Sequence, residues 1–120
     1  MYSETLLHFF RDPKRVGVLP APATVVEVMN PVCGDILRFS VRWEDNRLAD
    51  AAFQAKGCTA SIAAGAALTE WAIGKEPAQL AALTVAQVET LLDGLPNESK
   101  HAAALVVEAA QAAAQGSPDK

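Results

Sequence analysis

Cysteine and aromatic residues are scarce in this sequence. It has two Cys, and Phe, Trp and Tyr together make up 6% of its 120 residues. Two thiols can form one disulfide at most, so the fold must depend on a packed core rather than on a disulfide framework. Lys and Arg number 10 and form no cluster. The chain therefore lacks the basic patch with which proteins bind nucleic-acid phosphates, and we expect no nucleic-acid partner.

Long apolar runs are absent as well. No segment approaches the roughly 20 consecutive apolar residues that a membrane helix needs, so we expect no membrane segment. The first ten residues include Glu4 and His8 and lack the basic start and apolar stretch of a secretory signal. These absences predict a cytoplasmic chain, in which thiols stay reduced and cysteines more often bind metal or do chemistry.

The remaining composition is that of an ordinary globular domain. Hydrophobic residues make up 51% of the chain, charged residues make up 20%, and the net charge is −4. A length of 120 residues predicts a single domain over residues 1–120. Three prolines and a glycine between residues 11 and 22 predict a loop. Residues 1–22 should therefore form an N-terminal helix and loop, and residues 116–120 a flexible tail.

Three segments have the pattern of β-strands. Residues 24–29 are short and β-branched. Residues 35–43 alternate, with Leu37, Phe39, Val41 and Trp43 facing one way and Arg38, Ser40 and Arg42 facing the other. Residues 49–56 alternate too, with Ala49 and Ala51 on the apolar side, after a turn at residues 44–46. Short connections between the three favour an antiparallel sheet.

Helical patterns occupy most of the remaining chain. They cover residues 3–10, 58–73, 84–92 and about 97–114. Ser3 and Thr84 are suitable N-caps, and Gly74 ends the long central helix. Strands followed by helices predict an α+β fold, with a three-stranded antiparallel sheet covered on one face by helices.

Two cysteines and an aspartate lie where these elements end. Cys33 and Asp35 share the turn NPVCGD at residues 30–35, so a thiol and a carboxylate can point to one spot. Cys58 begins the central helix, where the helix dipole favours the thiolate, which is the form that binds metal. The alternatives are structural: a small buried Cys, or an Asp that stabilises a turn.

His101 stands in the first turn of the last helix. A single His at such a position is more often a surface or capping residue than a metal ligand. Together with Cys33, Asp35 and Cys58 it makes a Cys2AspHis set, which could hold zinc or iron tetrahedrally if the fold brings the four residues together.

The sequence resembles the iron–sulfur cluster assembly scaffolds typified by IscU and the N-terminal domain of NifU. The resemblance runs from Tyr2 to about Ala114. It rests chiefly on NPVCGD at 30–35, KGCTASIAAGAALTEWAIGK at 56–75 and KHAAAL at 100–105. It implies the α+β fold expected above, with a cluster site exposed at one end of the sheet.

The resemblance also implies ligands. Cys33 and Cys58 match two of the family's three cluster cysteines, and Asp35 matches an oxygen ligand that helps keep the cluster releasable. His101 matches the His that precedes the third cysteine. The implied cargo is iron or a [2Fe–2S] cluster, with zinc as an alternative occupant. The implied partners are a cysteine desulfurase and apo iron–sulfur proteins that accept the cluster.

The sequence departs from this pattern at Ala102, which stands in the position of the third cysteine. A methyl group can neither ligate a metal nor receive sulfur. Two subunits of a homodimer could instead share a cluster, because two chains supply four thiols. The family's chaperone-binding segment LPPVK reads LPNES at 95–99, so we do not expect recognition by that chaperone.

Two other functions stay open, and catalysis is not expected. The chain could be a zinc-binding sulfur acceptor for a desulfurase, or a degenerate member that acts as an interaction module without metal. It has no nucleophile elbow and no Gly-rich phosphate loop, so we predict that it is not an enzyme. Ser61 has no evident base partner, and we interpret it as a small polar residue packed near a helix start.

Overall fold

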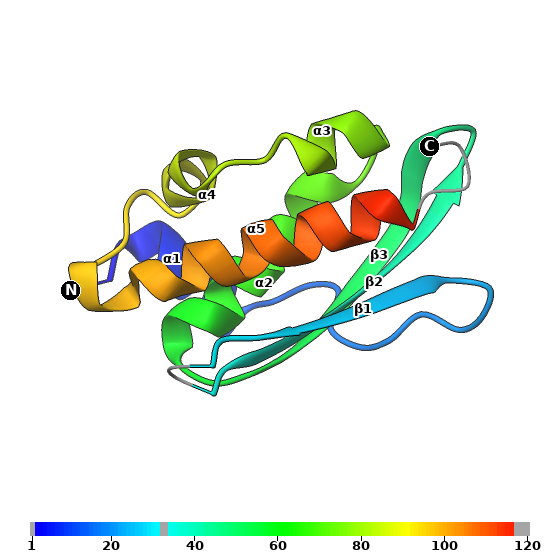
Figure 1. Ribbon diagram of the computed structural model, residues 1–120. Helices are drawn as coiled ribbons and strands as arrows, with labels where there is room; N and C mark the ends of the chain where they lie inside the picture. Colours follow the sequence, from blue (N-terminus) through cyan, green and yellow to red (C-terminus); the bar gives the residue numbers. More distant parts are fainter. Residues whose placement is uncertain (1, 32–33, 117–120) are drawn as a thin grey trace.

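A computed structural model describes residues 2–31 and 34–116, and its architecture is α+β (Figure 1). Strands β1 (Thr24–Met29), β2 (Ile36–Glu44) and β3 (Arg47–Lys56) form an antiparallel sheet in the order β1-β2-β3. The predicted fold class is confirmed.

The helices pack on one face of this sheet (Figure 1). They are α1 (Glu4–Arg11), α2 (Thr59–Ala72), α3 (Pro77–Ala81), α4 (Val85–Leu91), the short 3₁₀ helix η1 (Asn97–Ser99) and α5 (Lys100–Gln115). Helix α5 packs against β1 and β2, and α2 packs against β3 and α5. Helix α1 contacts α2, while α3 and α4 contact α5. No described helix is long and apolar enough to cross a membrane.

Small residues let α2 approach the sheet closely. Its 14 residues include six alanines and Gly65, and its buried residues lie on all sides of the helix. A Cβ on Gly65 would lie 2.9 Å from the ring of Phe53 on β3, closer than real Cβ contacts allow. Helix α2 is therefore a buried helix, and it can lie this close to the sheet only because its residues facing the sheet are small.

The hairpin between β2 and β3 corrects one strand prediction. Asp45 and Asn46 have φ values of 53° and 61°, as a two-residue turn that matches the strand twist requires. The register shifts between Arg42 and Trp43, so Trp43 pairs with Leu48. Ala49, expected on the apolar side, is exposed, and Leu48 is buried instead. The bulge reverses the alternation at this end of β3.

The loop after α1 covers part of the sheet that the sequence pattern predicts to face solvent. Val16 forms a bridge with Phe53 at the edge of β3, and the Leu19 N–H donates to the Ser40 hydroxyl at 3.1 Å. Ser40 was expected on the polar side of β2, yet it is only 1% exposed. The alternation is correct, and a segment distant in sequence buries this position.

One helix was not predicted. Helix α3 begins with Pro77 and has a reciprocal capping box between Glu76 and Gln79. Both are helix-start signals, but the helix is only 5 residues long and its periodicity is too short to read. The other predicted helices are present, with side-chain caps at Ser3 and Thr84 as expected.

Candidate metal centre

Strand register brings Asp35 and Cys58 together. Ile36, the first residue of β2, pairs with Lys56, the last residue of β3. Asp35 therefore lies beside the chain that leaves β3, where Gly57, with φ at 152°, turns the backbone into α2. Cys58 is the N-cap residue of α2, as predicted, and its side chain makes no capping hydrogen bond. Its thiol is thus available to the neighbouring groups.

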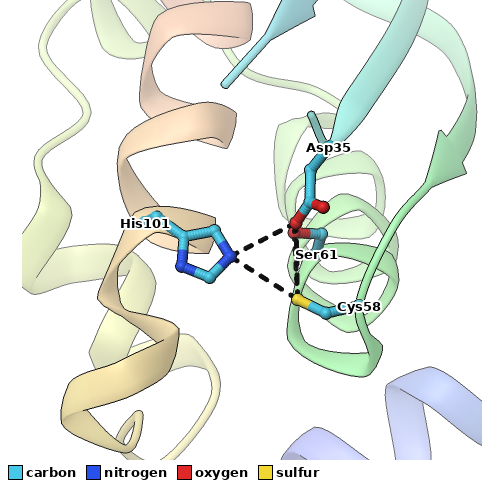
Figure 2. Close-up of polar contacts among 4 residues, drawn as sticks. All are labelled: Asp35, Cys58, Ser61 and His101. Carbon is cyan, nitrogen blue, oxygen red and sulfur yellow. Dashed lines mark hydrogen bonds and ion pairs between the residues drawn. The ribbon is translucent and has the colours of Figure 1, made fainter. Parts of the chain in front are cut away.

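Helix α5 supplies the third group. His101 is the second residue of this helix, and its Nε2 atom lies 3.6 Å from Cys58 Sγ and 3.2 Å from Asp35 Oδ2. Cys58 Sγ lies 3.4 Å from the same Asp35 oxygen. Figure 2 shows the three side chains pointing toward one another from the residue before β2, the N-cap of α2 and the first turn of α5. Within the described ranges this is the group of His, Cys and acidic residues that could hold an ion.

The three distances match one face of a metal tetrahedron. Zinc and iron of this coordination have ligand bonds of about 2.0–2.3 Å, which places neighbouring ligand atoms about 3.3–3.6 Å apart. The measured separations are 3.2, 3.4 and 3.6 Å. A single ion could thus contact sulfur, oxygen and nitrogen with little rearrangement. The donor set is one that both zinc and iron accept.

Asp35 is the most enclosed of the three. Its side chain is 8% exposed, against 22% for His101. Burial raises the pKa of Asp35 and is the largest single influence, but hydrogen bonds from Ser61, Cys58 and His101 together outweigh it. The pKa of Asp35 therefore lies below its ordinary value, and the carboxylate is ionised at neutral pH.

The cluster does not have the geometry of a nucleophilic triad. In such a triad one ring nitrogen faces the nucleophile, and the acid orients the ring through the other nitrogen. Here Cys58 and Asp35 both face Nε2 of His101. Three potential ligand atoms converge on one point instead, and such a group could hold a metal ion.

Two predicted features have different outcomes. Cys33 lies outside the described residues, so its place in the site stays a prediction. Ala102, next to His101, is fully buried in α5. Its methyl group leaves this position of the helix without a donor atom.

Sequence reasoning missed Ser61. Its hydroxyl donates to Asp35 Oδ2 at 2.6 Å and lies 3.4 Å from Cys58 Sγ. Ser61 is fully buried, and these two atoms are the polar contacts of its hydroxyl. The spacing of the two residues could have indicated this contact, because residues three positions apart lie on the same side of a helix.

The chain is similar to known proteins over most of its length. The family model of the NifU-like N-terminal domain matches residues 1–120. The iron–sulfur cluster assembly scaffold protein IscU 1 of Archaeoglobus fulgidus is 37% identical over 109 residues, covering 91% of this chain and 71% of that protein. IscU of Haemophilus influenzae is 32% identical over 116 residues, covering 93% and 91%.

Solved structures share the fold. A protein of Fervidobacterium islandicum assigned to the SUF system as an iron–sulfur cluster assembly scaffold superimposes with a TM-score of 0.78 at 19% identity, covering 94% of this chain and 96% of that chain. An N-terminal NifU-like protein of Brucella abortus gives a TM-score of 0.65 at 23% identity. The α+β fold of this chain is therefore the fold of these structures. The chain belongs to the NifU-like N-terminal domain family.

Proposed function

We propose that this chain is a scaffold or carrier in iron–sulfur cluster assembly, with iron or a [2Fe–2S] cluster as its cargo. Relatives named as assembly scaffolds align with more than nine-tenths of the chain, which supports the proposal. The observation that carries it is the triangle of Asp35, Cys58 and His101, whose atoms lie 3.2–3.6 Å apart.

Each residue has a distinct role in holding this cargo. Cys58 binds as a thiolate, so loading releases its proton. His101 binds through Nε2 as a neutral ring, which requires its proton to be on Nδ1. Asp35 is already ionised and adds an oxygen. Cys33 lies two residues before Asp35 and is the candidate for a fourth position.

The mixed ligand set favours release over permanent storage. Stable iron–sulfur clusters are usually held by four thiolates. A carboxylate oxygen is a harder ligand than sulfur and binds this cargo less strongly. With Ala102 in place of a further thiol, the site offers oxygen and nitrogen where a storage protein would offer sulfur. A carrier that passes its cargo on needs this lability.

The proposal requires a source and an acceptor. A cysteine desulfurase would supply sulfur, and apo iron–sulfur proteins would receive the cluster. Since Cys58 is a free thiol and half-buried, a reducing compartment such as the cytoplasm suits the site.

Anaerobic reconstitution tests the proposal. The full chain is incubated with ferrous iron and sulfide, desalted, and measured for iron, acid-labile sulfide and visible charge-transfer absorption. We expect absorption and bound sulfide in the wild type, with large losses in Cys58→Ala and Cys33→Ala. A wild type that acquires neither iron nor sulfide would overturn the proposal and favour the metal-free interaction module.

Zinc binding is the second candidate, and the geometry of the site is compatible with it. The three described ligand atoms surround a single point, which suits one ion as well as it suits one iron of a cluster. In this case the chain would accept sulfur from a desulfurase while holding zinc. Metal analysis of freshly purified protein separates the two, because one zinc per chain without acid-labile sulfide indicates the acceptor.

A further inference from the structure

Ser61 is the buried polar residue that the ligand set leaves unexplained. It lies in the first turn of α2, is fully buried, and has alanines around it, among them Ala60, Ala63 and Ala64. An alanine would fit this environment at least as well, because Ala is the better helix former and needs no polar partner. The hydroxyl therefore serves a purpose other than packing.

The contacts of the hydroxyl indicate that purpose. Ser61 Oγ lies 2.6 Å from Asp35 Oδ2 and 3.4 Å from Cys58 Sγ, and both atoms are candidate ligands (Figure 2). The Ser61 backbone N–H also donates to the carbonyl of Cys58 at 3.1 Å. Two atoms of Ser61, Oγ and the backbone N, thus make three contacts with Asp35 and Cys58.

The contact with Asp35 is the one that a bound ion would leave in place. Oδ2 of Asp35 also lies 3.4 Å from Cys58 Sγ and 3.2 Å from His101 Nε2. An ion between these three atoms takes the places of the Cys58 S–H proton and of any proton on Nε2. The Ser61 O–H is not a ligand in this triangle, and Oδ2 keeps a second lone pair to accept from it.

We propose that Ser61 is a positioning residue that orients the Asp35 carboxylate toward the ion, through the hydrogen bond from Oγ to Oδ2, in both the empty and the loaded site. This inference rests on the proposed metal-binding function. It assigns Ser61 an outer-shell role, since groups that hydrogen-bond to ligating carboxylates fix their direction and raise metal affinity.

Cobalt binding tests the assignment without any assembly assay. Co²⁺ substitutes for zinc or iron, and its visible bands report both occupancy and coordination geometry. We expect Ser61→Ala to raise the Co²⁺ Kd by roughly 10–100-fold, the range for loss of an outer-shell partner. We also expect its d–d bands to change in shape and intensity, because an unrestrained Asp35 binds with altered geometry.

Ser40→Ala is the matched control. Ser40 is also buried, accepts from the Leu19 N–H and donates to the Ala52 carbonyl. Ser40 lies on β2, five residues after Asp35, and five residues of extended chain span about 17 Å. This variant loses a buried hydroxyl without contact to the site, so its Kd and cobalt spectrum should equal those of the wild type. Urea unfolding of both variants measures the purely structural effect.

The outcomes separate the two proposals. If the wild type binds no Co²⁺, Zn²⁺ or Fe²⁺, the proposed function fails, and the role of Ser61 fails with it. If the wild type binds and Ser61→Ala has the same Kd and spectrum, or binds more tightly, only the role of Ser61 is overturned. Equal changes in Ser61→Ala and Ser40→Ala would also overturn it, because the effect would then be one of general stability.

Discussion

Gly57 lies directly against Asp35. A Cβ built on Gly57 would lie 2.5 Å from both the carboxylate carbon and Oδ1 of Asp35, where no real Cβ is found. Gly57 also has a φ of 152°, a backbone conformation that residues with a side chain rarely adopt. The backbone between β3 and α2 therefore packs directly against the Asp35 carboxylate. The carboxylate can occupy this place only because residue 57 has no side chain.

Gly57→Ala should displace Asp35. We expect the variant to fold with a free energy of unfolding lower by about 1–3 kcal/mol, because both strain and overpacking act at this position. Metal affinity should fall by at least about 10-fold, since the carboxylate must move away from the triangle. Urea unfolding and Co²⁺ titration measure the two effects.

Gly74→Ala is the control for strain alone. Gly74 has φ at 84°, and an added Cβ there would have nothing within 4 Å. This variant should lose stability and keep the metal affinity of the wild type. If Gly57→Ala bound metal as tightly as Gly74→Ala, the close approach to Asp35 would have no bearing on the site.

His101→Ala should weaken metal binding more than loss of an outer-shell contact does. The variant removes one of the three proposed ligands, so its Kd for Zn²⁺ should rise by more than the roughly 10–100-fold typical of groups that only hydrogen-bond to a ligand. Competition with a chromogenic chelator measures this affinity. The other histidine, His8, is exposed on α1, and His8→Ala should bind as the wild type does. Similar affinities for the two variants would remove His101 from the site.

Asp35→Asn should change how metal-free protein responds to acid. The pKa of Asp35 is lowered in the folded chain, so its stabilising contribution is fully present above the unfolded pKa of about 3.9. That contribution is lost as pH falls through the lower folded pKa. The difference in free energy of unfolding between wild type and variant should thus be largest near neutral pH and shrink below about pH 4.

Urea unfolding in the presence of a chelator, at several pH values, measures this difference. The chelator keeps metal from adding its own binding energy to the wild type. A difference that grew as the pH fell would mean that the carboxyl is favoured in its neutral form in the folded chain, which contradicts the hydrogen bonding around Asp35.

Ala102→Cys should strengthen the hold on the cargo. The variant restores a thiol next to His101, at the position of the cysteine in the scaffolds that the sequence resembles. We expect a chelator to remove the reconstituted cluster more slowly, since a thiolate is added to a site that otherwise offers one nitrogen and one oxygen ligand beside its cysteines. The added sulfur enters a fully buried position, so stability should fall by about 1–3 kcal/mol.

Ala104→Cys controls for a thiol added elsewhere on α5. Ala104 is exposed, and a thiol there faces solvent. Its cluster lifetime should match that of the wild type. An equal gain from the two variants would indicate nonspecific iron binding by added thiols.

Local sequence signals predicted most elements because those signals act within a few residues. The alternation in β2, the Ser3 and Thr84 caps, and the glycine after α2 were all read correctly. The failures arose where distant segments meet. Ser40 is buried by the loop after α1, and the bulge at Trp43 exposes Ala49, neither of which the local pattern encodes.

The site was predicted in part for the same reason. Asp35 and Cys58 could be predicted because each lies at the boundary of an element and carries a group suited to binding a metal ion. His101 by itself is a weak signal, and the local sequence around Ser61 predicts only a packing residue. Their importance depends on contacts across 66 and 26 positions of the chain to Asp35.

The amino-acid sequence alone determined which chemical groups are present and at which element ends they stand: a thiol at the start of a helix, a carboxylate after a turn, an imidazole in a first helical turn, and alanine where a third thiol would be. Whether these groups meet was decided only by tertiary structure. The pairing of Ile36 with Lys56 and the packing of α5 across the sheet bring them within 3.6 Å. Register and helix packing are properties of the whole core, and no local stretch of sequence specifies them.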